Sequence, residues 1–162
     1  MITFTVLVVL PAMHRLPSAI EEHIPPDITV KIWLSESPWA SISRIEGSLT
    51  EDVISGRSPE GNAVLEKVFE PPVRLVDLRF AHNPDIDRPF IEKAARRFAE
   101  RDSGQEGRLT VLLLQTDLGY GLGRMLQVYS SMVGHEVRIC RTVEEAASVM
   151  EMDLSWYQSL DD

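Results

Sequence analysis

The segment best suited to ligand chemistry is a glycine-rich stretch between an aliphatic run and an amphipathic pattern. Gly119, Gly121 and Gly123 alternate there, with Asp117 before them and Arg124 after them. Glycine lets the backbone approach a ligand closely, and the free amides at a helix N-terminus favour a bound phosphate. The spacing matches neither Gly-x-Gly-x-x-Gly nor Gly-x-x-x-x-Gly-Lys-Ser/Thr, however, and Asp117 would repel a phosphate.

This spacing leaves two interpretations open. We favour a closed turn, in which Asp117 caps the helix and a neighbouring element packs directly over the glycines, so that Gly121→Ala lowers stability. In the alternative, an open cleft binds a nucleotide, a phosphorylated metabolite or a lipid, with Arg124 facing the cleft and Tyr120 on its rim. The candidate ligand-binding residues are Asp117, Gly119, Tyr120, Gly121, Gly123, Arg124, Asp77 and Arg79.

Asp77 ends an apolar run, where a catalytic carboxylate would lie in an α/β protein, because ligands gather at the carboxyl ends of parallel strands. Arg79 follows closely and favours a structural ion pair instead. No partner carboxylate or Gly-x-Ser-x-Gly elbow accompanies it. The histidines stand singly at positions 14, 23, 82 and 135, and Cys140 lies in an apolar strand pattern. We therefore predict no catalytic residues, no metal site and no cofactor.

A basic stripe follows the helical period between residues 88 and 102, opposite the apolar positions of the same segment. Such a stripe is usually a solvated helix face. Like-charged pairs at i,i+4 cost a few tenths of a kcal/mol each, so in an acidic protein the stripe is a candidate docking surface for an acidic protein partner. Its members are Lys93, Arg96, Arg97 and Arg101.

Composition narrows the class of protein. The 162 residues are 44% hydrophobic and 25% charged, which is typical of one globular domain. Sixteen basic residues against 25 acidic ones give a net charge of −9, with no separate basic arm, so a general nucleic-acid binder is not expected. The single cysteine excludes a disulfide within the chain.

The first half of the chain predicts a hairpin and then helices. Alternating apolar residues indicate a half-buried strand over 28–34 and a second strand over 39–45, joined by the turn Ser35–Pro38. The sequence Ser48–Glu51 matches a capping box and predicts a short helix. Another helix is expected from about Asn62 until two prolines end it.

Beyond residue 72, strands and helices alternate. The predicted strands cover residues 73–80, 109–115 and 137–140. One helix is predicted over 88–102, and a second is indicated by the apolar residues at positions 122, 125, 126 and 129. A third helix is predicted to begin at a capping box that starts with Thr142. This order predicts an α/β fold: a mostly parallel sheet of about five strands, opened by the hairpin, with flanking helices. The domain is expected to cover 28–152, followed by a C-terminal tail over 153–162.

The N-terminal residues 2–10 are almost all apolar, but no basic residue precedes them, which disfavours a signal peptide. The run is also too short to span a bilayer. We expect residues 3–10 to form an extra strand that covers a sheet edge or apolar face, within an N-terminal extension over 1–27. A translation start at Met13 is an alternative. The protein is expected to be cytoplasmic, without a membrane span.

Four segments together resemble the bacterial SpoIIAA-like STAS domain family. They are Val76–Arg79, Thr116–Met125 with its Gly-x-x-Arg-Met helix start, Glu136–Thr142, and Glu145–Ala147. The resemblance covers about 28–152 and implies a fold shared with anti-sigma-factor antagonists and the cytosolic domains of sulfate transporters. Relatives of this kind mainly bind proteins, and some bind nucleotides or lipids.

The sequence departs from these relatives at a regulatory position. Anti-sigma-factor antagonists carry a phosphorylatable serine at the start of the helix after the Asp-bearing strand, but Ala81–Pro89 contains neither Ser nor Thr. The resemblance therefore implies a non-enzymatic regulatory or protein-interaction module without that serine, with homodimerisation left open. The alternative is a small-ligand-binding protein or enzyme that uses the turn Asp117–Arg124.

Overall fold

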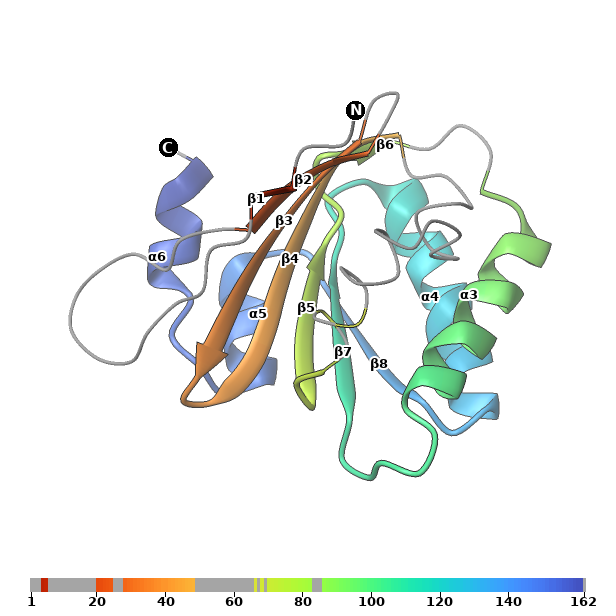
Figure 1. Cartoon of the computed structure of the whole chain (residues 1–162). Helices are drawn as coiled ribbons and strands as arrows, with labels where there is room; N and C mark the ends of the chain where they lie inside the picture. The colour runs from red at the N-terminus through yellow and green to blue at the C-terminus, as the bar shows by residue number, and fades with distance from the viewer. Residues whose placement is uncertain are drawn as a thin grey trace.

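A single mixed sheet forms the centre of the molecule (Figure 1). The computed structural model describes residues 4–5, 20–24, 28–48, 66, 68, 70–82 and 86–161. The strands are β1 (Phe4–Thr5), β2 (Ile20–Ile24), β3 (Ile28–Glu36), β4 (Trp39–Ser48), β5 (Val73–Asp77), β6 (Ala81–His82), β7 (Leu109–Leu113) and β8 (Glu136–Cys140). Their order is β1-β2-β3-β4-β5-β7-β8, with β6 beside β4.

The sheet changes direction at β4. Strands β1 to β4 pair antiparallel, with β3 and β4 as the predicted hairpin, whereas β4, β5, β7 and β8 pair parallel. The predicted α/β fold class, a mostly parallel sheet opened by a hairpin, is confirmed, although the described sheet has eight strands where about five were predicted. The described part of the predicted N-terminal strand is β1, which pairs with β2, a strand that the sequence pattern did not indicate.

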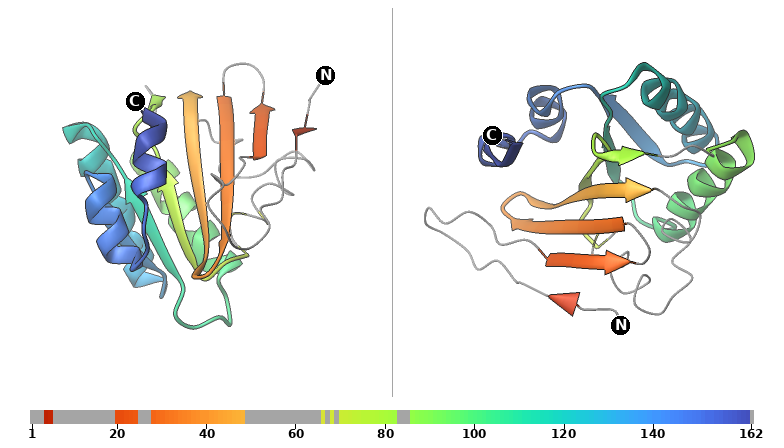
Figure 2. Two further views of the ribbon diagram at one scale, coloured as in Figure 1. Left: turned by 90° about the vertical axis from the view of Figure 1, so that its left-hand side faces the viewer. Right: turned by 90° about the horizontal axis from the view of Figure 1, so that it is seen from above.

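Helices cover both faces of the sheet (Figure 2). Helices α3 (Arg88–Arg101) and α4 (Asp117–Met132) lie on one face. Helices α5 (Val143–Met150) and α6 (Ser155–Gln158), with the 3₁₀ turn η1 (Ser159–Asp161), lie on the other. Each β–α–β connection returns the chain to a parallel neighbour, which is how such a sheet is built.

The larger apolar core lies between the sheet and helices α5 and α6. It contains Trp33, Ala40, Ile42, Leu75, Val111, Leu113, Cys140, Val143, Ala146, Met150, Leu154 and Tyr157. Burial of Trp33 differs from the half-buried strand predicted for 28–34, because the rings of Trp156 and Tyr157 cover that face of β3. Leu154 and Tyr157 belong to the predicted C-terminal tail, and both are buried.

Local sequence explains where the helices begin. Asp87 caps α3 by accepting the Phe90 amide, and a proline occupies the first turn of the helix, where its missing amide costs nothing. Thr142 caps α5 in the same way through the Glu145 amide. Helix α4 is capped by Thr116, whose Oγ1 accepts the Gly119 amide over 3.0 Å. The prediction that Asp117 caps this helix is therefore wrong: Asp117 is its first residue.

Two other boundaries differ from the predictions. The strand predicted over 73–80 ends at Asp77, because the Asp77 carboxylate accepts the Arg79 amide and turns the chain towards β6. Strand β4 runs to Ser48, the first residue of the predicted capping box, instead of ending at residue 45. The rest of that capping box, and most of the helix expected from Asn62, lie outside the described residues; Glu66 and Val68 are helical.

Candidate functional site

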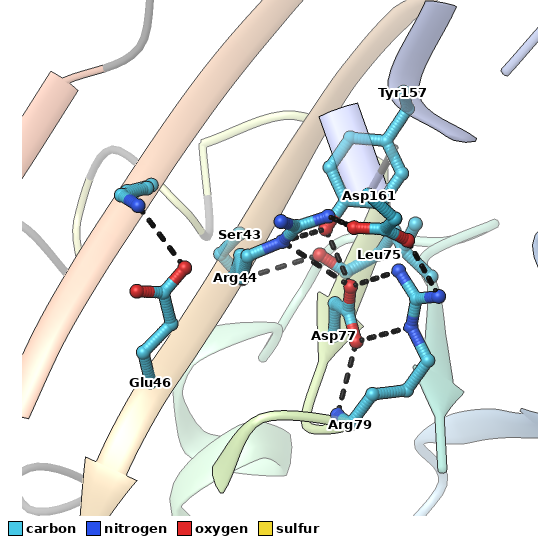
Figure 3. Close-up of polar contacts among 9 residues, drawn as sticks. Ser43, Arg44, Glu46, Leu75, Asp77, Arg79, Tyr157 and Asp161 are labelled. Carbon is cyan, nitrogen blue, oxygen red and sulfur yellow. Dashed lines mark hydrogen bonds and ion pairs between the residues drawn. The ribbon is translucent and has the colours of Figure 1, made fainter. Parts of the chain in front are cut away.

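The most connected polar cluster of the α5–α6 face lies at the carboxyl end of β5 (Figure 3). Asp77 is fully buried there, next to Arg44, its register partner on β4. The Tyr157 hydroxyl donates to Asp77 Oδ2 over 2.6 Å, and Arg79 Nη2 donates to the same oxygen over 2.8 Å. Asp77 Oδ1 accepts the Arg79 backbone amide and Nε, each over 3.0 Å. Both carboxylate oxygens are therefore satisfied by protein donors.

A second carboxylate, that of Asp161 on η1, bridges the two arginines. Arg44 Nη2 lies 2.5 Å from Asp161 Oδ1, and Arg79 Nη1 lies 2.8 Å from Oδ2. Arg44 Nε donates to the Tyr157 hydroxyl over 3.1 Å and lies 3.6 Å from Asp77 Oδ2. The C-terminal segment thus completes a cluster that begins on β4 and β5.

The electrostatics of this cluster stabilise its present ionisation states. Burial disfavours the charge on Arg79, but the hydrogen bonds and attraction of Asp77 and Asp161 outweigh it and raise the pKa of Arg79. Burial and the neighbouring Asp77 carboxylate raise the pKa of the Tyr157 hydroxyl. Tyr157 therefore stays a protonated hydrogen-bond donor at neutral pH.

An aromatic ring lies against both arginines. The guanidinium carbon of Arg44 lies 4.6 Å from the centre of the Phe80 ring, and that of Arg79 lies 5.2 Å from it. Such cation–π contacts stabilise partly desolvated guanidinium groups. Phe80 itself is 43% exposed, so the arginine pair lies next to an exposed apolar side chain.

The glycine-rich stretch lies within the first two turns of α4. A Cβ on Gly119 would lie 2.9 Å from Thr116 Oγ1, and one on Gly123 would lie 2.5 Å from Leu114 Cδ1. Gly123 is therefore the glycine that close packing requires. A Cβ on Gly121 would meet no atom of the described residues within 4 Å, so none of the described elements packs over Gly121 as expected.

The polar side chains around this glycine-rich stretch form two separate sets of contacts. Arg124 donates to Gln127 Oε1 over 2.7 Å, one turn along the same helix. Asp117 accepts from Arg141 Nη2 over 2.8 Å, and the Arg141 guanidinium lies 4.4 Å from the Tyr120 ring centre. The structure thus brings Asp117 and Tyr120 together through Arg141, a residue the sequence did not single out. The sequence feature that could have identified Arg141 as a candidate site residue is its position directly after β8.

The basic stripe lies along α3 as its spacing predicted. Lys93 and Arg96 are exposed, whereas Arg97 and Arg101 are half-buried. Burial, and after it the neighbouring Arg97 charge, lower the pKa of Arg101, whereas the Glu66 carboxylate acts in the opposite direction. The stripe lies on the opposite side of the sheet from the Asp77 cluster.

A second buried cluster, which sequence reasoning missed, lies near the amino ends of β5 and β7. Thr110 Oγ1 lies 3.1 Å from His135 Nε2, and His135 Nδ1 lies 2.7 Å from Asp102 Oδ2. Arg74 Nε donates to Thr110 Oγ1 over 2.7 Å, and Arg74 Nη2 is paired with Asp102 Oδ2. An arginine inside the apolar strand 73–77 was the available signal, because a buried charge requires a partner.

The Asp102–His135–Thr110 order is that of an acid–base–nucleophile chain. Thr110 is fully buried, and His135 and Asp102 are 3% and 8% exposed. The hydroxyl also accepts from Arg74, so it is neither accessible nor free to attack a substrate. Interaction with His135 and Arg74 outweighs the effect of burial and lowers the pKa of Asp102. This arrangement is an internal ion pair and hydrogen-bond network.

Neither a metal-binding cluster nor a membrane-spanning helix is present in the part of the chain that the structure describes. No group of three or more His, Cys, Asp or Glu side chains is arranged there to hold a metal ion. None of the described helices is both long enough and apolar enough to cross a bilayer.

Comparisons with known proteins concern the fold. The chain matches no protein-family model and no curated protein. Among solved structures it is similar to an uncharacterized protein from the DUF3478 family with a SpoIIAA-like fold, from Shewanella loihica PV-4. The two chains share 15% identity with a TM-score of 0.49, over 86% of this chain and 99% of that one. The likeness is one of fold alone.

Proposed function

We propose that this protein is a non-enzymatic interaction module that binds an acidic protein partner through the basic stripe on α3. The observation that carries the proposal is the like-charged pair Arg97 and Arg101 at i,i+4, with Arg96 exposed beside it. In a chain with a net charge of −9, this concentration of positive charge on one helix is unusual. An acidic partner would relieve the repulsion within the stripe, and the contact would weaken with salt.

The two clusters that carry enzyme-like residues support a binding role. Asp77 and Thr110 are both fully buried, and protein groups already satisfy their polar atoms. A general base or nucleophile must reach its substrate within hydrogen-bond distance. Neither residue does so in this arrangement.

The proposed module also lacks one form of control. The junction Ala81–Pro89 contains no Ser or Thr, so a kinase has no hydroxyl there on which to place the two negative charges of a phosphate. We therefore propose that the partner is bound without a phosphorylation switch at this junction.

The alternative, an anionic ligand at the turn Asp117–Arg124, gains no support from the contacts described above. Arg124 is engaged by Gln127, and the Asp117 carboxylate already lies at the positive end of α4. Leu114 also lies where a ligand would have to approach Gly123.

The experiment is affinity purification from the native host with two matched charge reversals. Arg96→Glu changes an exposed charge in the stripe, and Arg138→Glu changes one on β8 whose side chain is 57% exposed. We expect Arg96→Glu to reduce recovery of the partner about tenfold and Arg138→Glu to leave it unchanged. Equal recovery with both variants, or no protein recovered above a tag-only control, would contradict the proposal.

A further inference from the structure

The arginine pair at the carboxyl end of the sheet has the geometry of an oxyanion site. Arg44 extends from β4 and Arg79 from the turn after β5, and each points one edge of its guanidinium at Asp77 (Figure 3). Their other nitrogen atoms converge on a single carboxylate, that of Asp161, with one oxygen for each arginine. Two guanidinium groups that share one planar group are a common way to hold a carboxylate or phosphate.

The two carboxylates of this cluster are held very differently. The Asp77 side chain is fully buried, ends a central strand and accepts from Tyr157 and Arg79. The Asp161 side chain is 22% exposed and belongs to a three-residue 3₁₀ turn. Among the described residues, its side chain is held by the ion pairs with Arg44 and Arg79. Asp77 is therefore part of the framework, whereas Asp161 can leave without disturbing the sheet.

Charge balance indicates what must replace Asp161. With both carboxylates in place, two guanidinium groups face two negative charges. Without Asp161, one positive charge is left on side chains that are only 8% and 15% exposed. Such a partly desolvated charge requires an anion.

We propose that Arg44 and Arg79 form a binding site for an oxyanion group, a carboxylate or a phosphate, and that Asp161 is its internal occupant. In this structure the site is occupied by the Asp161 carboxylate of the same chain. A ligand enters by displacing Asp161, with Asp77 and Tyr157 holding the two arginines in place. This site is separate from the α3 stripe and stands whether or not that stripe binds a protein.

An occupant on the same chain competes at a high effective concentration, in the millimolar range for a short connection. The wild-type protein should therefore bind small oxyanions weakly. Asp161→Ala removes the competitor and leaves both arginines, so we expect it to bind acetate and inorganic phosphate about tenfold or more tightly than the wild type. Asp161→Asn keeps the shape of the side chain without its charge and should show a smaller gain.

The test is a titration of the full chain with acetate, and separately with inorganic phosphate, at constant ionic strength. Binding is followed through the side-chain ¹⁵N resonances of Arg44 and Arg79. The matched control is Glu136→Gln, which frees Arg138 from an ion pair whose two side chains are more than half exposed. The expected result is a gain in affinity for Asp161→Ala, with shifts at Arg44 and Arg79, and no gain for Glu136→Gln.

The two probes also distinguish the source of the oxyanion, because tighter binding of acetate indicates a carboxylate ligand and tighter binding of phosphate indicates a phosphorylated one. No gain for either Asp161 variant with both probes would overturn the proposal and make Asp161 a structural clamp. A gain equal to that of Glu136→Gln would overturn it as well. Neither result would affect the partner-capture experiment on α3.

Discussion

Two buried charged clusters lie at opposite ends of the same strand, β5, and on opposite faces of the sheet. Asp77, its last residue, faces α6, whereas Arg74, near its start, faces α3 and α4, because successive side chains of a strand alternate. The Arg74 cluster is completed by residues of the parallel α/β core. The Asp77 cluster is completed by the last turn of the described chain. One cluster is therefore closed, and the other has a carboxylate that can be exchanged.

The difference shows that arginine–carboxylate pairs have different roles according to how deeply they are buried. Asp102 and Asp161 each pair with arginine, but the Asp102 side chain is 7% exposed and that of Asp161 is 22% exposed. Removing one partner of a buried pair leaves an uncompensated charge and is strongly destabilising. Removing a partner that water or an ion can replace costs little.

The largest expected effect follows deletion of residues 153–162. The deletion removes Leu154 and Tyr157 from the core, and each side chain of this kind contributes roughly 2–5 kcal/mol. Because a domain is stable by only about 5–15 kcal/mol, we expect the cooperative unfolding transition to disappear in calorimetry. A truncated protein that unfolds cooperatively near the wild-type temperature would show instead that residues 153–162 are dispensable for folding.

Asp102→Ala should have the next largest effect, a loss of about 3–5 kcal/mol of unfolding free energy in a denaturant titration, because it removes a buried carboxylate that pairs with both Arg74 and His135. Glu136→Gln, which breaks an exposed arginine pair, is the control and should change stability by less than about 1 kcal/mol. Similar losses in both variants would remove the distinction between closed and exposed pairs.

The pH dependence of the unfolding free energy is a second test of the cluster that contains Asp102. The pKa of Asp102 is lowered in the folded state, so its contribution is fully present above the unfolded-state value of about 3.9. The contribution is lost as the pH falls through the folded-state pKa. Asp102→Asn should therefore lose less of its remaining stability on acidification than the wild type does. A parallel acid profile for the two proteins would contradict this account.

Tyr157→Phe should have an intermediate effect, a loss of about 1–3 kcal/mol, because the ring stays packed while Asp77 loses a donor. The raised pKa of Tyr157 means that its contribution is present below the unfolded-state value of about 10 and is lost as the pH rises above it. Denaturant titrations above pH 10 should show a steeper fall for the wild type than for the variant. A variant as stable as the wild type at pH 7 would show that the hydroxyl is dispensable.

The smallest expected effect is that of Asp161→Ala, a loss of about 1 kcal/mol or less, measured by the same titration. The bridged arginines keep Asp77 as a partner, and an ion from the buffer can take the place of Asp161. A loss as large as that of Asp102→Ala would mean that both clusters are closed.

The fold could be predicted because its signals are local. Alternation of apolar residues marked β3 and β4, and the period of 3.6 marked α3 with Ile91, Ala94 and Ala95 on its buried side. Capping residues such as Thr142 fixed the start of α5 to the residue. Thr116 and Asp117 are adjacent and both are good capping residues, however, so the sequence pattern assigned the cap of α4 to Asp117 instead of Thr116.

The polar clusters could be predicted only in part, because their members are distant in sequence. Arg44 and Asp161 are 117 positions apart, and no sequence period or spacing indicates that their side chains are in contact. Asp77 and Arg79 were found together because they lie two residues apart on one turn. Arg74 was missed, although an arginine inside an apolar strand requires a buried partner that the fold must supply.

The most direct test of the difference between the two clusters is the unfolding free energy of Asp102→Ala and Asp161→Ala with and without added inorganic phosphate, at constant ionic strength. A ligand stabilises only the protein whose folded state it can enter. We predict that phosphate increases the stability of Asp161→Ala more than that of the wild type and leaves Asp102→Ala with its full deficit. Equal gains in the two variants, or no gain in either, would contradict the assignment of an open site at Arg44 and Arg79 and a closed one at Arg74.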